Sequence, residues 1–173
     1  VHNPPMRPEA ITPRLLPLRR FVAMVPDRVH EQVLSRFCNH LARGQAIGDD
    51  LAELPACRLE IRISDTASRL RFNLAQGRVH GGGARGADLP GVILSGMLED
   101  FLRIILRLED PDTLFFQRRL SIEGDTAAGL HIKNLLDAWE FDWRAHLRSV
   151  LGARASSPLI RLLQSTGLEQ GLT

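Results

Sequence analysis

Three groups of residues in the sequence have types and spacings that could support chemistry. The first is the run 81–86, which has the G-x-G-x-x-G spacing of a dinucleotide-binding loop and follows a strand-like segment. Such a loop needs a helix to begin at its end, because the first backbone amides of that helix hold the pyrophosphate. The next residues, 88–91, read Asp-Leu-Pro-Gly and cannot open that helix. We therefore interpret 81–86 as a flexible hairpin exit, with nucleotide binding as the alternative.

The second group is Cys38 and His40, with His30 nearby. A zinc site needs three or four ligands in tetrahedral reach, and helix residues two apart point in different directions. We expect a core thiol beside a surface histidine and no metal. Cys38 and Cys57 are the two cysteines of the chain, which favours a reducing compartment and two free, buried thiols.

The third group is His131, with Asp125 and Asp137 each six residues away. A separation of six does not place two side chains on one helix face, so we expect a partly buried, structural histidine. Glu123 and Asp125 could form a carboxylate pair, but Asp125 is better placed to cap a helix. Nothing here combines a nucleophile, a base and oxyanion donors. We predict that the protein is not an enzyme and uses no cofactor.

Length and composition indicate one globular domain with a proper core. The chain has 173 residues, of which 44% are hydrophobic and 24% charged. A net charge of +2 is too weak for a general nucleic-acid binder. No uncharged apolar run approaches the length of a membrane span, and no secretory signal is visible, so we expect a cytoplasmic protein.

The two ends of the chain are basic and rich in leucine, whereas the middle is mildly acidic. We therefore expect a segment at 1–26, a central domain at 27–142 and a helical extension at 143–173. The apolar residues of the two ends lie beside arginines, a pattern typical of helices that contact an anionic membrane: Leu15, Leu16, Phe21, Val22 and Val25 beside Arg14, Arg19 and Arg20, and Trp143, Leu147, Val150 and Leu151 beside Arg144 and Arg148. We predict peripheral contact with the inner membrane, with packing of both ends on the central domain as the alternative.

The pattern of apolar and polar residues in the central domain predicts an α+β fold. Asp27 can cap a helix whose apolar stripe is Val29, Val33, Leu34, Phe37 and Leu41. Alternation at 58–82 predicts a three-stranded meander, followed by short strands at 92–94 and 119–123. A helix over 98–108 is expected to stop at Pro111. Asp125 can cap the last core helix, which presents Ala128, Ile132, Leu135, Leu136, Trp139 and Trp143 on one face.

One stretch is specific enough to suggest a family. Residues 110–126 read DPDTLFFQRRLSIEGDT, and the pattern continues through Gly129-Leu130 and Lys133-Asn134-Leu135-Leu136-Asp137. This stretch resembles the sterol carrier protein type 2 superfamily, whose hallmark is an FFQ-x-x-L-x-I-x-GD run before the last core helix. The longer form resembles one subfamily, the accessory factors of anaerobic ubiquinone biosynthesis. Ala127-Ala128 departs from the acidic residue expected early in that helix.

The resemblance implies a five-stranded sheet covered by helices around an apolar tunnel, and ligand binding without catalysis. It further implies that the isoprenoid tail of ubiquinone precursors is held while oxygen-independent hydroxylases act on the ring. Any iron–sulfur cluster would belong to those partners, because two cysteines cannot supply four thiolate ligands.

A tail-binding cavity needs apolar lining and no buried charge. The residues that we predict to line it are Phe101, Leu102, Ile105, Phe115, Phe116, Leu120, Ile122, Leu135, Leu136 and Trp139. Ordinary core packing is the alternative for each of them. Two other functions stay open: a general carrier of phospholipids or acyl chains, and a scaffold subunit with a filled core.

Overall fold

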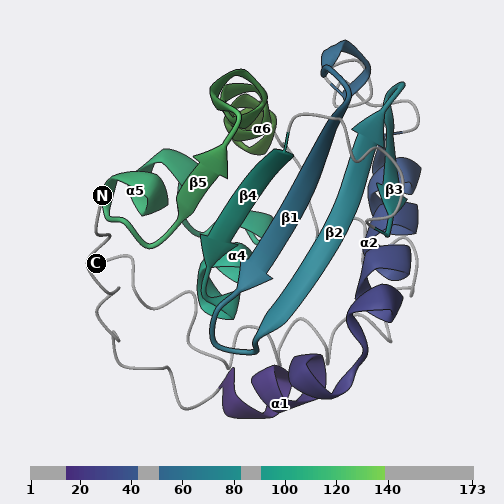
Figure 1. Cartoon of the computed structure of the whole chain (residues 1–173). Helices are drawn as coiled ribbons and strands as arrows, with labels where there is room; N and C mark the ends of the chain where they lie inside the picture. Colours follow the sequence, from purple (N-terminus) through teal and green to yellow (C-terminus); the bar gives the residue numbers. More distant parts are fainter. Residues whose placement is uncertain (1–14, 43–50, 83–90, 139–173) are drawn as a thin grey trace, which may run out of the picture.

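A single five-stranded sheet organises the protein. The computed structural model describes residues 15–42, 51–82 and 91–138. The strands are β1 (Cys57–Ile63), β2 (Ser68–Ala75), β3 (Arg78–Gly81), β4 (Gly91–Gly96) and β5 (Ser121–Gly124). They lie in the order β3-β2-β1-β4-β5 (Figure 1), with β1 parallel to β4 and every other pair antiparallel. The mixed sheet and its helices confirm the α+β prediction and the expected positions of the strands.

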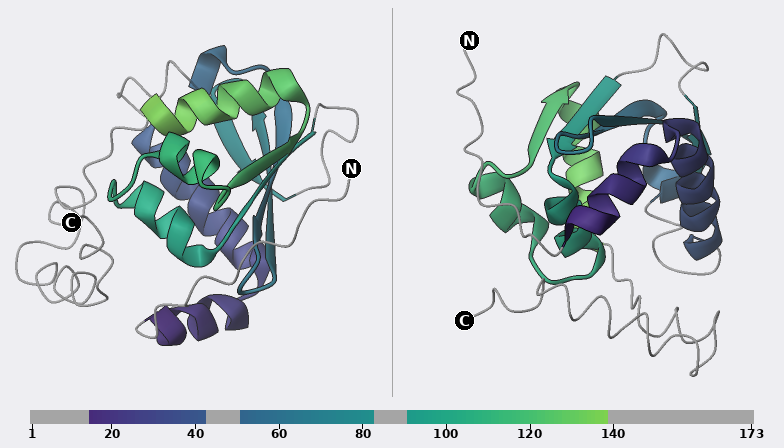
Figure 2. Two further views of the ribbon diagram at one scale, coloured as in Figure 1. Left: turned by 90° about the vertical axis from the view of Figure 1, so that its left-hand side faces the viewer. Right: turned by 90° about the horizontal axis from the view of Figure 1, so that it is seen from below.

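The sheet has one apolar and one charged face, because successive side chains of a strand point to opposite sides. Leu59 of β1 pairs with Phe72 of β2 and with Val92 of β4, so that three apolar side chains share a face. Arg58 and Glu60 alternate with them on the other face. The helices gather on one side of the sheet, and its second face carries none of them (Figure 2).

Three helices after β4 cover the apolar face: α4 (Leu98–Ile105), α5 (Pro111–Phe116) and α6 (Thr126–Ala138). The helix predicted over 98–108 does end before Pro111, at Ile105, but the prediction missed α5, which begins at Pro111. Asp110 is its N-cap and accepts a hydrogen bond from the backbone N of Thr113 at 3.1 Å. Asp followed by Pro is a common start of a helix, since proline at the first position needs no hydrogen-bond donor.

Helix α2 (Asp27–Leu41) buries a polar stripe against the sheet edge, contrary to the expected apolar stripe. Glu31 and Ser35 are buried, whereas Val29 and Val33 are exposed. Asp27 is also not the predicted N-cap, since Pro26 holds that position. The predicted stripe is thus only partly correct: Leu41 is buried and Leu34 packs on the core, but the inward face is shared with Glu31 and Ser35, and Val29 and Val33 point outward.

The reason lies in the unequal lengths of the edge strands. β3 pairs only with the second half of β2, from Phe72 onward, and leaves the backbone amides of Arg69 and Arg71 without a strand partner. Arg69 N donates to Asp27 Oδ2 at 3.1 Å, and Arg71 N donates to Glu31 Oε1 at 2.8 Å. A buried amide without a partner costs about 1–3 kcal/mol, so the part-buried bond to Glu31 contributes more than the exposed bond to Asp27 to holding the polar face of α2 on the sheet.

Asn39 extends the same arrangement to β3. Its side-chain Nδ2 donates to the Val79 carbonyl at 2.7 Å, and its Oδ1 accepts from Val79 N at 2.9 Å. The amide thus bonds the outer edge of β3 as another strand would. An edge strand covered in this way is protected against pairing with another chain.

Helix α1 (Leu16–Met24) packs one side on the domain and leaves the other exposed. Leu18 and Val22 contact the main apolar cluster, and Arg19 Nε lies 2.7 Å from Asp65 Oδ2 in the turn between β1 and β2. Phe21 and Met24 are exposed. The alternative of packing on the central domain is therefore correct for one face of this helix. Residues 143–173 lie outside the described residues.

Candidate functional site

The space between the apolar sheet face and helices α4, α5 and α6 is the candidate site. Two clusters of apolar side chains fill it. The larger spreads over the sheet, and the smaller consists of Ile104, Leu114 and Leu120. Phe101 of α4 and Leu136 of α6 pack against both clusters. These two residues therefore stand where the clusters adjoin.

The structure brings most of the predicted lining residues together. Six of them are half-buried and pack on one or both clusters: Phe101, Leu102, Phe115, Ile122, Leu135 and Leu136. Leu120 is buried in the smaller cluster. Two others face outward, since Ile105 is 44% and Phe116 91% exposed. Trp139 lies outside the described residues. The lining role of the set stays a prediction.

An ion-pair network fixes α4 to the segment between α5 and β5. Arg119 lies 2.5 Å from Asp100 Oδ1 and 3.3 Å from Glu109 Oε2. Arg103 joins Glu109 to Glu99, at 3.3 and 3.0 Å. Asp100 Oδ2 also accepts a hydrogen bond from Met97 N at 3.2 Å, which caps the first turn of α4. The network sets the spacing between α4, which carries Phe101, and the segment that follows Phe115 of α5.

Asp100 is the most deeply buried charged residue of this network. Burial raises the pKa of its carboxyl above the usual aspartate value, although Arg119 and the Met97 amide oppose the shift. A carboxyl whose pKa is higher in the folded than in the unfolded state adds stability while protonated and loses that contribution as the pH rises.

We expect the pH dependence of stability to reveal this carboxyl. The free energy of unfolding of the wild type, minus that of Asp100→Asn, should fall as the pH rises from the ordinary aspartate pKa through the raised one. Urea unfolding of both proteins at a series of pH values measures this difference. A difference that grows with pH would instead show that the Arg119 ion pair outweighs the burial of Asp100.

Helix α6 is anchored at both ends of its described length. Asp125 Oδ1 accepts a hydrogen bond from Ala128 N at 2.8 Å, which confirms the predicted cap. Lys133 forms ion pairs with Asp112 of α5 and with Asp137 one turn further along α6. The inner face with Ala128 and Ile132 is buried as predicted. The helix that supplies Leu135 and Leu136 is thus tied to α5.

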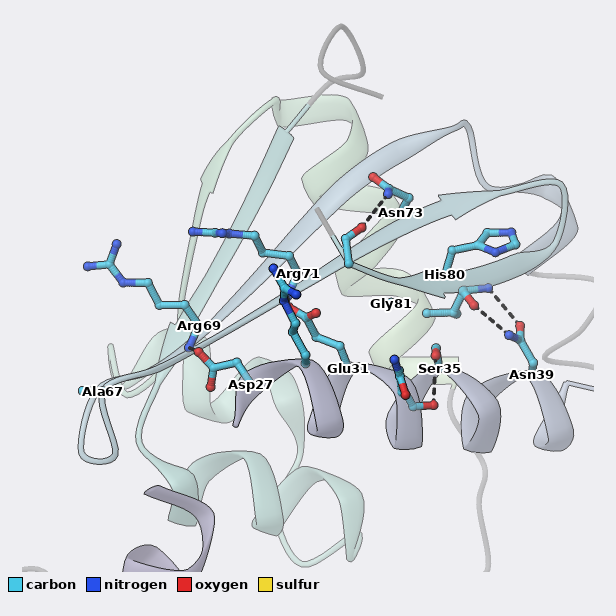
Figure 3. Close-up of a pocket in the computed structure, with 14 residues that line it drawn as sticks. Asp27, Glu31, Ser35, Asn39, Ala67, Arg69, Arg71, Asn73, His80 and Gly81 are labelled. Atoms are coloured by element: carbon cyan, nitrogen blue, oxygen red, sulfur yellow. Dashed lines mark hydrogen bonds between the residues drawn. The ribbon is translucent and has the colours of Figure 1, made fainter. Parts of the chain in front are cut away.

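Neither of the two best-defined pockets among the described residues is lined by the predicted set. The larger, of about 960 Å³, lies between α2 and strands β2 and β3. Most of the residues that line it are polar or charged, and they include Arg69, Arg71, Asn73 and His80 of the strands and Glu31 of α2 (Figure 3). An apolar tail would gain little from such a lining, because the hydrophobic effect scales with buried apolar area.

The smaller pocket, of about 380 Å³, lies on the charged face of the sheet over β1, β2 and β4. Glu60 lines it, and hydrogen bonds from Arg62 and then Arg71 hold the pKa of this carboxyl below its usual range. Sequence reasoning missed both pockets. The four-residue spacing of Asp27, Glu31, Ser35 and Asn39 was the available signal for the polar face of α2.

The other candidate groups from the sequence are placed as follows. Cys38 and Cys57 are free thiols, and burial raises the pKa of Cys38 to about 11. His131 is exposed, so the expected partial burial was wrong. No cluster of His, Cys, Asp or Glu in 15–42, 51–82 and 91–138 could hold a metal ion.

Most of the glycine run 81–86 lies outside the described residues. No described helix is long and apolar enough to cross a bilayer.

Comparison with known proteins identifies the family. Residues 36–137 match the SCP-2 sterol transfer family. The chain belongs to the SCP-2 sterol transfer family. It is 38% identical over 122 residues to the ubiquinone biosynthesis accessory factor UbiT of Escherichia coli K12, with 70% of this chain and 68% of UbiT covered. UbiT of Escherichia coli O157:H7 matches equally well. The resemblance in residues 110–137 is thus confirmed.

A solved structure agrees with the SCP-2 assignment at the level of the fold. The UbiJ-SCP2 ubiquinone synthesis protein superposes with a TM-score of 0.51 at 17% identity, over 66% of this chain and 94% of that one. The five-stranded sheet with helices on its apolar face is therefore an SCP-2 fold.

Proposed function

We propose that this protein is a non-catalytic accessory factor of ubiquinone biosynthesis that holds the isoprenoid tail of ubiquinone precursors. The observation that carries the proposal is the 38% identity to UbiT, which extends over 70% of this chain. The half-buried apolar side chains between the sheet and α4 to α6 support it, because a tail needs apolar surface that is not already sealed.

The physical need for such a factor follows from the tail itself. Each methylene moved from water into an apolar environment contributes about 0.8 kcal/mol, so a polyprenylated ring is almost insoluble in water. An enzyme in the cytoplasm can reach the ring only if another surface shields the tail. We propose that oxygen-independent hydroxylases are the partners that act on the exposed ring, and that the protein associates with an anionic membrane as a peripheral protein.

Within this proposal the predicted residues divide by their exposure. The tail lies between the sheet and the helices, against Phe101, Leu102, Phe115, Leu120, Ile122, Leu135 and Leu136. Ile105 and Phe116, which face outward, contact it where it leaves the interior. Trp139, outside the described residues, completes the set.

Growth without oxygen tests the proposed pathway role. In cells grown without oxygen, deletion of the gene should abolish ubiquinone synthesis and cause its prenylated precursors to accumulate. In aerated cells, the ubiquinone content should stay normal. Chromatography of quinone extracts from both cultures measures this. Normal ubiquinone without oxygen would reject the role, and loss under both conditions would point to a general carrier of phospholipids or acyl chains.

A scaffold function is the second candidate, favoured by one observation. Seven of the nine described lining residues pack in or against the core clusters, and the two best-defined pockets lie elsewhere. Native mass spectrometry of gently purified protein separates the two functions. A carrier shows adducts of co-purified lipid, whereas a scaffold is free of ligand and ignores added prenylated phenols.

A further inference from the structure

The face of the sheet that carries no helix is strongly basic. Residues paired across neighbouring strands share a face, so the strand register fixes which side chains it presents. In Figure 1 this face is turned toward the viewer, and no helix lies in front of β1 and β2. Among the described residues it carries five arginines and two glutamates, which are Arg58, Arg62, Arg69, Arg71 and Arg78 with Glu60 and Glu123.

Glu60 holds two of these arginines in place. Arg62 Nε donates to Glu60 Oε1 at 2.6 Å, and Arg71 Nε donates to Glu60 Oε2 at 3.2 Å. Both bonds use Nε, and within the described ranges the terminal nitrogens of these two guanidiniums form no hydrogen bond to a carboxylate. One carboxylate shared by two arginines leaves positive charge in excess. Their forked guanidinium groups match the geometry of further carboxylates.

The pocket of about 380 Å³ lies on this basic face, over β1, β2 and β4. Arg58 and Arg71 line it, and Ile93 of β4 adds a small apolar surface. Asn73, which is 6% exposed, lies in the same lining and donates from Nδ2 to the Gly82 carbonyl at 3.0 Å. Its buried Oδ1 has no hydrogen-bond partner in the part of the chain that the structure describes. A buried acceptor of this kind favours a partner that donates an N–H.

This combination fits an acidic protein surface better than a nucleic acid or a bilayer. Phe72 is the one Phe, Tyr or Trp of the five strands and lies on the apolar face, so the basic face has no such ring to stack on a base. Glu60 and Glu123 would repel a continuous run of phosphates. Among the described residues, no strand carries an exposed large apolar side chain that could enter a bilayer. A protein surface supplies carboxylates and N–H donors at separate positions.

We propose that the helix-free face of the sheet, centred on the arginines around Glu60, is the docking surface for a partner protein that presents carboxylates. This inference rests on the proposed partnership with oxygen-independent hydroxylases and names the surface on which they bind. Carboxylates of the partner pair with the arginines, and an N–H of the partner donates to Asn73 Oδ1. The helices α4, α5 and α6 lie on the opposite side of the sheet, so a tail can enter or leave beneath them while the partner stays bound.

Surface plasmon resonance with the purified hydroxylases and the full chain tests the surface, at about 50 and about 300 mM salt. Arg69→Gln/Arg78→Gln removes two exposed charges from the face and should raise the Kd about 5- to 20-fold at the lower salt, mainly through slower association. Glu60→Gln makes the face more positive and should lower the Kd about threefold, which damage to the fold would not do. Arg20→Gln/Arg36→Gln, exposed on α1 and α2, removes the same charge elsewhere and should bind as the wild type does.

The outcomes separate this surface from the proposed function. If the wild type binds the hydroxylases but neither Arg69→Gln/Arg78→Gln nor Glu60→Gln changes the Kd, the face is overturned and the partnership stands. If the wild type binds no hydroxylase at either salt concentration, both fall, while tail binding is judged by co-purified lipid alone. If instead a single-stranded oligonucleotide binds the wild type and Arg69→Gln/Arg78→Gln abolishes that binding, the face recognises nucleic acid and the protein partner is rejected. Thermal unfolding checks that each variant keeps its fold.

Discussion

A tryptophan in place of Leu136 is expected to leave the protein folded but unable to retain an apolar tail. Leu136 lies on α6 where the two apolar clusters adjoin, so a larger side chain there takes up the space between sheet and helices. If the indole displaces about four methylenes of the tail, at about 0.8 kcal/mol each, affinity falls about 200-fold. Binding of a fluorescent prenylated phenol and mass spectrometry of co-purified lipid both measure the loss.

Controls must separate blocked binding from a damaged core. Overpacking costs about 1–3 kcal/mol of stability, which thermal unfolding will detect. Leu136→Met keeps the volume and should bind normally, and Leu130→Trp adds the same indole to the exposed side of α6. Leu102→Trp, on α4, approaches the same interior from another helix. Unchanged binding in both interior variants would place the tail elsewhere and favour the scaffold function.

The strands were predictable because their pattern is local. Leu59 and Ile61 alternate with Arg58 and Glu60, and the structure places the two kinds on opposite faces of β1. Helix α6 could be predicted equally well, because the Asp125 cap and the apolar side with Ile132 lie within one short segment of the sequence. The motif in residues 110–126 indicated the family. The alternation of apolar and polar residues could not have indicated it.

The orientation of α2 was not predictable from the same kind of pattern. Val29 and Val33 are typical of a buried stripe, yet the helix turns Glu31 and Asn39 inward. The partners of those side chains are backbone amides of strands forty residues further along the chain. The Arg71 amide is available because β3 is shorter than β2, and the Val79 groups are available because β3 is the edge strand. Neither fact is visible in the helix sequence.

The candidate site was predicted better as a region than residue by residue. Phe115 and Phe116 are adjacent and point in different directions, with Phe115 inward and Phe116 exposed. Which of the two turns inward depends on the register of α5, and α5 itself was missed at Pro111. The region followed from the family motif, whereas individual orientations depend on helix boundaries.

Removal of both polar anchors of α2 is expected to produce the largest loss of stability. In Glu31→Ala/Asn39→Ala, the backbone N of Arg71 and both the N and the O of Val79 lose the partners that they have in the wild type. A buried polar group without a partner costs about 1–3 kcal/mol, and some will be reached by water, so we expect a loss of about 3–5 kcal/mol. Urea unfolding measures it. Gln32→Ala/Arg36→Ala, exposed on the same helix, should change stability by less than about 0.5 kcal/mol.

The same variant should also expose the edge of the sheet. Without Glu31 and Asn39, the outer edge of β3 and the first half of β2 present free backbone groups, which are templates for pairing with another chain. We therefore expect concentration-dependent association in light scattering, well below the urea concentration that unfolds the variant. If Glu31→Ala/Asn39→Ala is as stable as the wild type and stays monomeric, the polar stripe does not hold α2. The valines of its outer face would then be free to turn inward, and the reason for their exposure would have to be sought elsewhere.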